Sequence, residues 1–373
     1  MKCDWVNWHE IPDGLHKSFA ELFSSNKSNE IISNVFTEVK MLKVNKDLYF
    51  PVTINNVELK NSFVCSPYTA YALYAKEEIT HKVTNRTLIF LLQQLVKILD
   101  SFLKIGNIDR NVHIQNFLLS TNPYPEWNGK EISNITDFVT QEYPRHAIIF
   151  RSLNVYQHQH LINEFEAKGY HKIGSRQVYI FDSDIQSWYR HQNNKHDKRI
   201  IKKHQLIYVP HENMYIYLAQ ALELYNKLYL IKYSVFNPQY TLSYFQACHK
   251  KNNIIHFQGY VDSNGKLKAF SGLFILGNTI TSPLVGYDTD APQTEGLYIH
   301  AIHLIMQYKF KHGLLLNLSS GAPKFKRLRG GMPAIEYSVV YTKNLPFKRR
   351  IIWTILQFIS NKIGVPLMNK YEL

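Results

Sequence analysis

Cysteine is scarce in this sequence, and long apolar segments are missing. The cysteines, Cys3, Cys65 and Cys248, lie far apart and form no Cys-x-x-Cys pair. This argues against a disulfide framework and a structural zinc site, and it fits a reducing compartment. No run of eighteen uninterrupted apolar residues occurs, so this criterion predicts no transmembrane helix. The start of the chain, MKCDWVNWHEIPDG, is acidic and has no apolar core, so we expect no secretory signal peptide.

The common catalytic motifs are also missing. The sequence contains no Gly-x-Ser-x-Gly, no Gly-x-x-x-x-Gly-Lys-Ser/Thr and no Gly-x-Gly-x-x-Gly, which leaves no motif support for a serine hydrolase, a P-loop nucleotidase or a Rossmann dehydrogenase. The 17 histidines do not recur at a metal-ligand spacing, and His158 and His160 do not share a helix face. We therefore predict no metal site.

Positive charge is in excess and unevenly distributed. Of the 373 residues, 45% are hydrophobic and 19% are charged, which is typical of a folded globular protein, and the formal net charge is +14. Residues 321–373 hold ten Lys or Arg against two acidic residues, and a second basic cluster lies at 195–204. This asymmetry favours a polyanionic partner: the phosphates of a nucleotide carrier, tRNA or an anionic membrane. A biased genome would produce the same Lys-rich composition.

The second half has the clearer pattern of elements. Strands are predicted at 253–260, 268–276 and Thr279–Tyr287, because the turn signals Asp-Ser-Asn-Gly (262–265) and Gly-Asn (277–278) separate them. An amphipathic helix follows at 295–311 and ends at a glycine, and strands are predicted at 314–318 and 334–341. The predicted order is a meander, a helix and two further strands.

The first half has a similar order. A hairpin is predicted from 48–55 and 62–68, long helices at 85–104 and 158–169, and strands at 112–119, 147–153 and 177–182. We therefore predict a mixed α/β (α+β) fold of two related units, 1–200 and 201–373, divided near a basic linker at 195–204. Each unit would be a mostly antiparallel sheet flanked by helices.

Residues 314–341 combine a strand, a Ser-Ser-Gly turn, a dense cluster of cations, a Gly-Gly pair and a second strand. The cations are Lys324, Lys326, Arg327 and Arg329. Like charges this close repel, so an anionic or carbonyl-bearing partner would explain them. A solvated basic loop is the alternative.

These residues resemble the GNAT acyltransferase fold, and the predicted pair of units resembles the tandem GNAT proteins of the FemAB/FemX type. The resemblance covers roughly residues 205–345: a helix, a glycine and the strand LLLNLSSG, then Phe325-Lys326 ahead of Arg329-Gly330. It implies acyl transfer from an activated carrier to an amine by direct attack, with the carrier in a V-shaped gap between two strands. The Arg/Gln-x-x-Gly-x-Gly/Ala loop of ordinary acetyl-CoA enzymes is missing.

The resemblance implies that Lys326 neutralises charge on the attacked carbonyl, as an oxyanion-hole group would. Asp288 is a candidate to take the amine's proton, and a loop-capping residue is the alternative. Tyr287 is the third catalytic candidate, either as a proton donor or as part of the core. Eight further residues are candidate substrate contacts, with Arg327 and Arg329 as phosphate ligands: Tyr233, Asn237, Tyr298, Asn317, Ser319, Ser320, Arg327 and Arg329. Glu336 is expected to pair with one of these arginines.

Partners follow from the same reasoning. We expect a small-molecule amine as acceptor, no tightly bound cofactor, and acyl-CoA, an acyl carrier protein or an aminoacyl-tRNA as donor. Alternatives are an aminoacyl-tRNA-dependent ligase of the FemX kind and a non-catalytic module that binds nucleic acid or membrane. Residues 345–368 read as an apolar helix with a cationic start, which either packs on its own domain or contacts an anionic membrane. We expect a cytoplasmic protein, with a peripheral position at the inner membrane surface as the variant.

Overall fold

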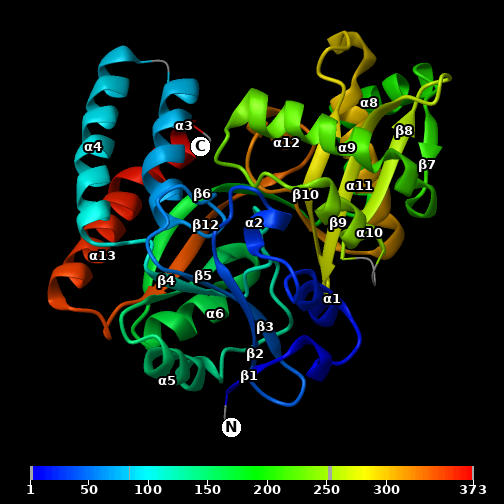
Figure 1. The fold of residues 1–373 in the computed structure, drawn as a ribbon. Helices are drawn as coiled ribbons and strands as arrows, with labels where there is room; N and C mark the ends of the chain where they lie inside the picture. The colour runs from blue at the N-terminus through cyan, green and yellow to red at the C-terminus, as the bar shows by residue number, and fades with distance from the viewer. Residues whose placement is uncertain (1–2, 84, 251–253, 372–373) are drawn as a thin grey trace.

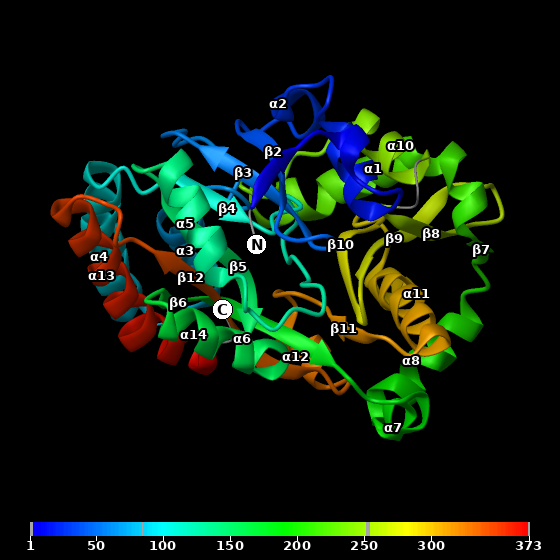
Figure 2. The ribbon, with the colours of Figure 1, turned by 90° about the horizontal axis from the view of Figure 1, so that it is seen from below.

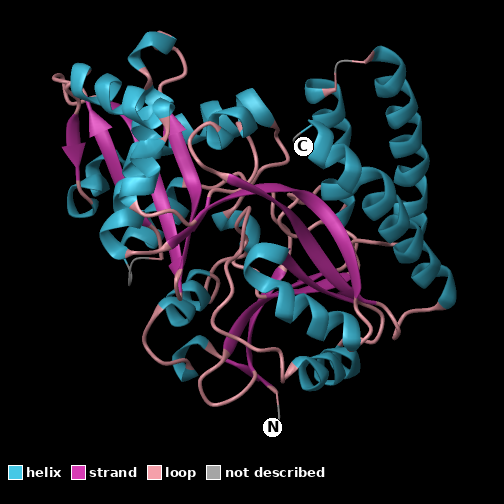
Figure 3. Ribbon diagram, turned by 180° about the vertical axis from the view of Figure 1, so that it is seen from behind, coloured by secondary structure: helices cyan, strands magenta, loops and turns pink. Residues whose placement is uncertain are grey.

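The computed structural model describes residues 3–83, 85–250 and 254–371. Its strands form one twelve-stranded sheet in the order β1-β2-β3-β4-β5-β12-β6-β11-β10-β9-β8-β7. Figure 3 shows the strands passing through the middle of the molecule with helices on both sides. The pairs β4–β5 and β10–β11 are parallel and the other pairs are antiparallel, so the predicted fold class is confirmed. The strands are β1 Asp4–Val6, β2 Glu38–Lys43, β3 Tyr49–Asn55, β4 Asn111–Ile114, β5 Ala147–Asn154, β6 His171–Phe181, β7 Ile207–Val209, β8 His256–Val261, β9 Leu267–Leu276, β10 Thr279–Tyr287, β11 Leu315–Asn317 and β12 Met332–Tyr341.

Helices cover both faces of this sheet (Figure 1). They are α1 Leu15–Leu22, α2 Ser28–Ile31, α3 Ala75–Lys82, α4 Arg86–Ile105, α5 Ile132–Glu142, α6 Val155–Ala167, α7 Ile185–Arg190, α8 Gln192–Lys203, α9 Leu218–Tyr225, α10 Leu242–Lys250, α11 Leu297–His312, α12 Pro323–Arg327, α13 Phe347–Ile359 and α14 Val365–Tyr371. Three segments are π-helical: Thr69–Tyr74, Asn226–Tyr233 and Ser360–Gly364.

The meander β8–β9–β10 and the helix α11 confirm the elements predicted for the second half. The turn before β9 is held by the Asp262 carboxylate, which accepts from the N–H groups of Asn264 and Lys266, and Gly265 adopts a φ of +75°. The expected first residue of β8, 253, lies outside the described residues. The expected helix and the strands after it are present, with ends shifted by a few residues.

Two predictions for the first half are wrong. Residues 62–68 form a turn and not a strand, and β3 pairs with β2 and β4. The Ser66 hydroxyl accepts from the Thr69 N–H and donates to the Asp109 carboxylate; such local side-chain bonds compete with a strand ladder. The prediction of a basic linker at 195–204 is also wrong, because most of this segment lies in α8.

The last strand of each half lies beside the other half. Strand β12 is inserted between β5 and β6, and β6 in turn pairs with β11. The two halves thus exchange their final strands at the centre of one continuous sheet. The predicted division at residues 200 and 201 stays a prediction.

Helices α3, α4 and α13 stand together at one side of the molecule (Figure 1). The predicted C-terminal helix is confirmed, with a π-helical turn between α13 and α14. The run Phe347–Tyr371 is long and apolar enough to cross a membrane by length and composition alone. It contains charged residues, so it has no uninterrupted apolar stretch of eighteen residues. It is nevertheless tied to β6, because Ser360 donates to the Gly174 carbonyl and Asn361 donates to the Lys172 carbonyl.

The largest apolar core joins the two halves. Phe19 and Ile32 from the N-terminal segment belong to the same buried cluster as Phe245 and Phe270. Ile32 also forms a β-bridge with Tyr240. This contact fixes the loop that follows the π-helical segment Asn226–Tyr233.

Candidate active site

Strands β10 and β11 separate near the middle of the sheet. They pair from Thr279 to Thr281 and from Leu315 to Asn317. Beyond a bulge, β10 continues along β9, whereas β11 ends. A pocket of about 130 Å³ occupies the gap, and Ser282, Val285, Ile302, Leu318 and Lys326 are among its lining residues. The structure thus contains a V-shaped gap between two central strands.

Lys326 holds the loop that borders this gap. The side chain is 3% exposed, and its ammonium donates to the carbonyls of Leu318 (2.7 Å), Ser319 (3.2 Å) and Ser320 (2.8 Å). A buried ammonium with three carbonyl acceptors can use all three of its protons. Lys326 therefore organises the backbone, and its predicted contact with the substrate carbonyl stays untested.

The same loop turns through unusual backbone conformations. Ser319, Gly321 and Ala322 have φ values of +56°, +83° and +46°, a region that costs free energy for residues other than glycine. No cis peptide occurs among the described residues, and in a trans peptide the C=O and the following N–H point in opposite directions. Since the carbonyls of Ser319 and Ser320 point at Lys326, the N–H groups of Ser320 and Gly321 point away from it.

The predicted contacts Asn317 and Ser319 shape this loop as well. The Asn317 side chain accepts from the Ser319 N–H at 3.0 Å, which makes an Asx turn directly after β11. The Ser319 hydroxyl accepts from Thr121 at 3.1 Å. Ser320 lines the pocket in the gap. The structure therefore brings Asn317, Ser319, Ser320 and Lys326 together in one loop beside the gap, and their predicted contacts with substrate stay untested.

A buried ion pair lies beside the gap. Arg176 on β6 and Glu336 on β12 are register partners, and Arg176 Nε donates to Glu336 Oε1 at 2.9 Å. Arg176 also donates to the Ser120 carbonyl and to the Thr121 hydroxyl. The prediction that Glu336 pairs with Arg327 or Arg329 is wrong, because β12 is inserted next to β6. Arg176 lines the pocket in the gap.

Arg151 on β5 adds a second buried guanidinium. It donates to the carbonyls of Val64, Leu119 and Ser120. Burial lowers the pKa of Arg151 to about 10, so it remains a cation at neutral pH. Arg151 and Arg176 lie 5.7 and 5.9 Å from the ring centroid of Phe63. The centre of the sheet is therefore electropositive and partly apolar.

Tyrosines form the opposite wall of the gap. Tyr229, Tyr233 and Asn237 come from the π-helical segment Asn226–Tyr233 and its exit, and Tyr298 comes from α11. The Asn237 side chain donates to the carbonyls of Tyr229 and Ser234, so it ends that helix. Burial raises the pKa of Tyr298 well above its usual value, which keeps its hydroxyl protonated. Each described π-helical segment lines a pocket here, a placement common at functional sites.

Asp288 and Tyr287 lie at the end of β10, in a second pocket beside the first turn of α11. Although burial opposes its ionisation, the Lys268 ammonium at 3.0 Å lowers the pKa of Asp288 below its ordinary value. The Tyr287 hydroxyl accepts from Lys232 at 3.1 Å, and its ring lies 5.7 Å from that of Tyr298. A carboxylate that is already paired is a weak proton acceptor. The catalytic roles of both residues stay untested.

The two arginines of the cationic segment differ. Arg329 is 7% exposed, and it forms a two-pronged ion pair with Asp197 of α8 at 2.5 and 2.7 Å. Its guanidinium also stacks on Phe325 at 3.5 Å. Arg327 and Lys324 are exposed. Arg329 therefore ties α12 to α8, and the anion-binding role predicted for Arg327 and Arg329 stays a prediction.

Helix α8 lies near α11 (Figure 2). Asn194 and Asp197 are buried, whereas five cations are exposed: Lys195, Lys198, Arg199, Lys202 and Lys203. A side chain at Gly296, which caps α11, would meet Ile200 of α8 at 2.7 Å. Helix α8 thus lies against the start of α11 through Ile200.

The sequence did not single out Arg151 and Arg176. Each is an isolated arginine within a strand, and nothing in its neighbours marks it. The available signal was burial: a charged residue inside an otherwise apolar strand needs a partner. Among the described residues, no group of three or more His, Cys, Asp or Glu could hold a metal ion.

Comparisons with known proteins give similarities of backbone arrangement. No family model matches the sequence, and no curated protein matches it. FemX is 11% identical, with a TM-score of 0.47 over 62% of this chain and 80% of its own. L-PGS from Bacillus licheniformis is 13% identical, with a TM-score of 0.44 over 70% and 96%. A tandem GNAT protein from the clavulanic acid biosynthesis pathway is 11% identical, with a TM-score of 0.37 over 63% and 76%. The structure is thus similar to GNAT-like structures.

Proposed function

We propose that the protein is an N-acyltransferase that moves an acyl group from an activated carrier to an amine. The observation that carries this proposal is the gap between β10 and β11, bordered by the loop 318–322 whose carbonyls bind Lys326. Backbone N–H groups held rigidly at the edge of a water-poor pocket are suited to stabilise a developing oxyanion.

In the proposed reaction, the acceptor ammonium first releases one proton to water, and the neutral amine nitrogen then attacks the thioester carbonyl and forms a C–N bond. The N–H groups of Ser320 and Gly321 stabilise the oxyanion of the tetrahedral intermediate. The C–S bond then breaks, and the thiolate leaves with the proton that the amine loses. Lys326 is a positioning residue in this scheme, and the Glu78 carboxylate, which also lines the pocket, attracts the acceptor ammonium. No covalent intermediate on the protein is required.

Positive charge supports a position for the donor's carrier near the start of α11. Helix α8 carries exposed cations and lies against the Gly296 cap of α11 through Ile200, and helix N–H groups together with cations favour phosphate. Acyl-CoA, an acyl carrier protein and an aminoacyl-tRNA all fit this chemistry. The α8 cations favour tRNA as the second candidate, which would make the protein an aminoacyl-tRNA-dependent ligase.

Calorimetry with acyl-CoAs and with charged tRNA tests these donors directly, and a thiol-release assay with a panel of amines tests the transfer. We expect binding of one donor class and amine-dependent turnover. Binding to nucleic acid or anionic vesicles that falls steeply with salt, without affinity for either donor, would instead favour a non-catalytic module.

A glycine substitution tests the loop itself. Gly321→Ala adds a methyl group with nothing within 4 Å but forces alanine into φ +83°, and Gly265→Ala does the same at +75° in a remote turn. Both variants should lose about 1–2 kcal/mol of stability, but only Gly321→Ala should lower kcat. Equal effects on kcat would contradict the proposed role of the loop.

Peripheral contact with an anionic membrane through residues 345–368 also remains our proposal. Phe347 and Phe358 are exposed on α13, and the exposed Lys348 and Arg350 follow Phe347 closely in the chain, a combination suited to headgroups. Arg349 is used within the protein, since it donates to the carbonyls of Gly106 and Asn107 at the end of α4. Co-sedimentation with phosphatidylglycerol vesicles should weaken in Phe347→Asp and stay unchanged in Thr80→Asp.

A further inference from the structure

An apolar pocket opens from the candidate active site between three helical segments. Its cavity volume is about 170 Å³. Each wall is one face of a helical segment, on which the lining residues recur about every three to four positions. The lining side chains are Ala70, Tyr71, Tyr74, Ala75, Glu78 and Ile79 from the first wall, Leu92, Leu95, Val96 and Leu99 from α4, and Leu356, Ile359, Ser360, Ile363, Gly364, Leu367 and Met368 from the C-terminal helix.

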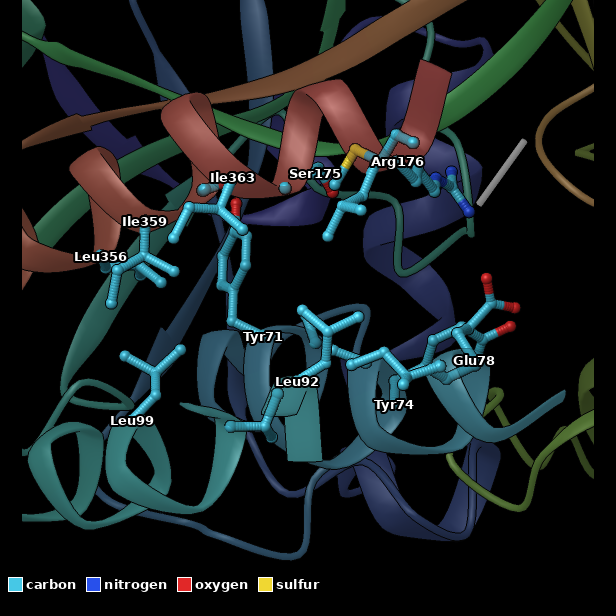
Figure 4. A pocket seen from close by; sticks show the side chains of 18 of the residues that line it. Tyr71, Tyr74, Glu78, Leu92, Leu99, Ser175, Arg176, Leu356, Ile359 and Ile363 are labelled. Atoms are coloured by element: carbon cyan, nitrogen blue, oxygen red, sulfur yellow. The ribbon is translucent and has the colours of Figure 1, made fainter. Parts of the chain in front are cut away.

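The pocket has one polar end. Figure 4 shows Glu78 and Arg176 at one end and Leu99 and Leu356 at the other. Phe63, Tyr74, Glu78, Arg176 and Ser320 line both this pocket and the pocket in the β10–β11 gap. A ligand whose polar end reaches Ser320 can therefore extend its apolar part between the helices.

Small residues keep the space open. Gly364 lies inside the C-terminal helix, where glycine lowers stability by about 1 kcal/mol relative to alanine. A Cβ atom there would meet its three nearest atoms at 3.7 to 3.9 Å, all from the same helix. Neither packing with a neighbouring segment nor a left-handed φ therefore requires this glycine. Its position in the pocket wall supplies the reason, because a larger side chain would enter the cavity.

The length of the pocket matches a hydrocarbon chain. The C-terminal helix contributes lining residues from Leu356 to Met368, a rise of about 18 Å along its axis. One layer of lipid chains is about 15 Å deep, half of the hydrocarbon thickness of a bilayer. The apolar walls of the pocket favour an apolar ligand between the helices.

We propose that this pocket binds the linear hydrocarbon chain of an amphiphilic substrate, with the polar end of that substrate at Arg176 and Ser320. The assignment of the chain to a substrate rests on the proposed transferase activity, whereas the binding itself does not. The chain belongs either to the acyl group of the donor or to a long-chain amine acceptor, and both have the same chemistry in the pocket.

The first experiment measures binding of the hydrocarbon chain without an acyl-transfer reaction. Calorimetry with fatty acids of increasing length should show an affinity that rises about fourfold with each added CH₂ until the pocket is filled. Gly364→Phe should lower the affinity for the longest bound chain by at least tenfold. Ala75→Phe narrows the pocket from the opposite wall and should do the same, so the test survives if one variant fails to fold. Lys362→Phe places the same ring on the exposed side of the helix and should bind like the wild type.

Affinity that does not change with chain length, or folded Gly364→Phe and Ala75→Phe variants that bind as the wild type does, would overturn the proposal. A wild type that turns over short acyl donors and short amines but binds no chain would overturn it while the proposed function stands. A wild type that binds chains but transfers no acyl group would leave the pocket assigned and reject the transferase.

The source of the chain is decided by two kinetic arms. One arm pairs a long-chain acyl-CoA with a short amine, and the other pairs a short acyl-CoA with a long-chain amine. Gly364→Phe should raise KM for the long-chain substrate in the arm that uses the pocket. No change of KM in either arm would contradict the assignment of the chain to a substrate.

Discussion

Arg176 and Glu336 face each other across the register of β6 and β12, with Arg176 Nε 2.9 Å from Glu336 Oε1. The Glu336 side chain is 1% exposed. This pair connects the last strand of one half to the last strand of the other, beside the pocket where we place the chemistry.

Breaking this pair should be costly. In Glu336→Gln a largely buried guanidinium loses its counter-charge, so we expect the free energy of unfolding in urea to fall by about 2–4 kcal/mol. Arg176→Met together with Glu336→Leu should lose less than the two single changes summed. Glu166→Gln is the control, because its pair with Lys172 is partly exposed and longer, at 3.4 Å, and should change stability by about 1 kcal/mol or less. Equal losses for the two pairs would refute the assignment.

Lys326→Met tests the loop through its anchor. Without the ammonium, the carbonyls of Leu318 and Ser320 lose the Lys326 donor and the Ser319 carbonyl keeps the Tyr179 N–H, so we expect the N–H groups of Ser320 and Gly321 to lose their alignment. We expect kcat to fall about 10²–10³-fold with little change in KM, in protein that remains folded by circular dichroism. Lys324→Met removes an exposed cation from the same helix and should leave kcat unchanged. A KM effect alone would point to substrate binding instead.

Arg329 and Asp197 offer a test of two interpretations. If Arg329 is structural, Arg329→Met and Asp197→Asn should each lower the free energy of unfolding by about 3 kcal/mol, with a strong coupling in the double variant. Both should then affect donor affinity equally. If Arg329 binds a donor phosphate, Arg329→Met alone should weaken donor binding and reduce its salt dependence.

Stability should depend on pH through Asp109. Burial raises the pKa of this carboxyl to about 6, from an ordinary value of 3.8. The folded state therefore holds the proton more tightly, so the group stabilises the fold below about pH 4, and this contribution is lost as the pH rises to about 6. The unfolding free energy of Asp109→Asn minus that of the wild type should grow by about 2 kcal/mol between pH 4 and pH 7. Buried histidines such as His16, whose pKa is lowered to about 4, contribute the same pH dependence to the wild type and to Asp109→Asn. Their contribution therefore cancels in the difference. A constant difference would contradict this prediction.

The sequence predicted those parts of the fold that local signals determine. The turn at Asp262 and the glycine that ends α11 locate the meander and its helix, because each sets the backbone within a few residues. The strand predicted at 62–68 failed because the Ser66 hydroxyl binds its own neighbourhood and Asp109. The spacing of apolar residues in the sequence gives no sign of such side-chain hydrogen bonds.

From the sequence, only the loop on one side of the candidate site could be proposed. Asn317, Ser319, Ser320 and Lys326 follow one another closely, so a single segment revealed them. Arg176 joins them because β6 pairs with β11 and β12, from chain segments more than 130 residues away, and no local pattern encodes such pairing. The apolar pocket likewise requires α4 and the C-terminal helix to face each other across the fold.

The exchange of final strands has a consequence for how the molecule is made. Strand β12 is synthesised near the end of the chain, yet it occupies the middle of the sheet, between β5 and β6. Until residue 341 has left the ribosome, β5 and β6 each present an open edge, and such edges recruit other chains. A nascent first half should therefore depend on chaperones, and the two halves produced separately should aggregate alone but recover solubility when co-expressed. Assembly of the candidate active site would then be the last event of folding.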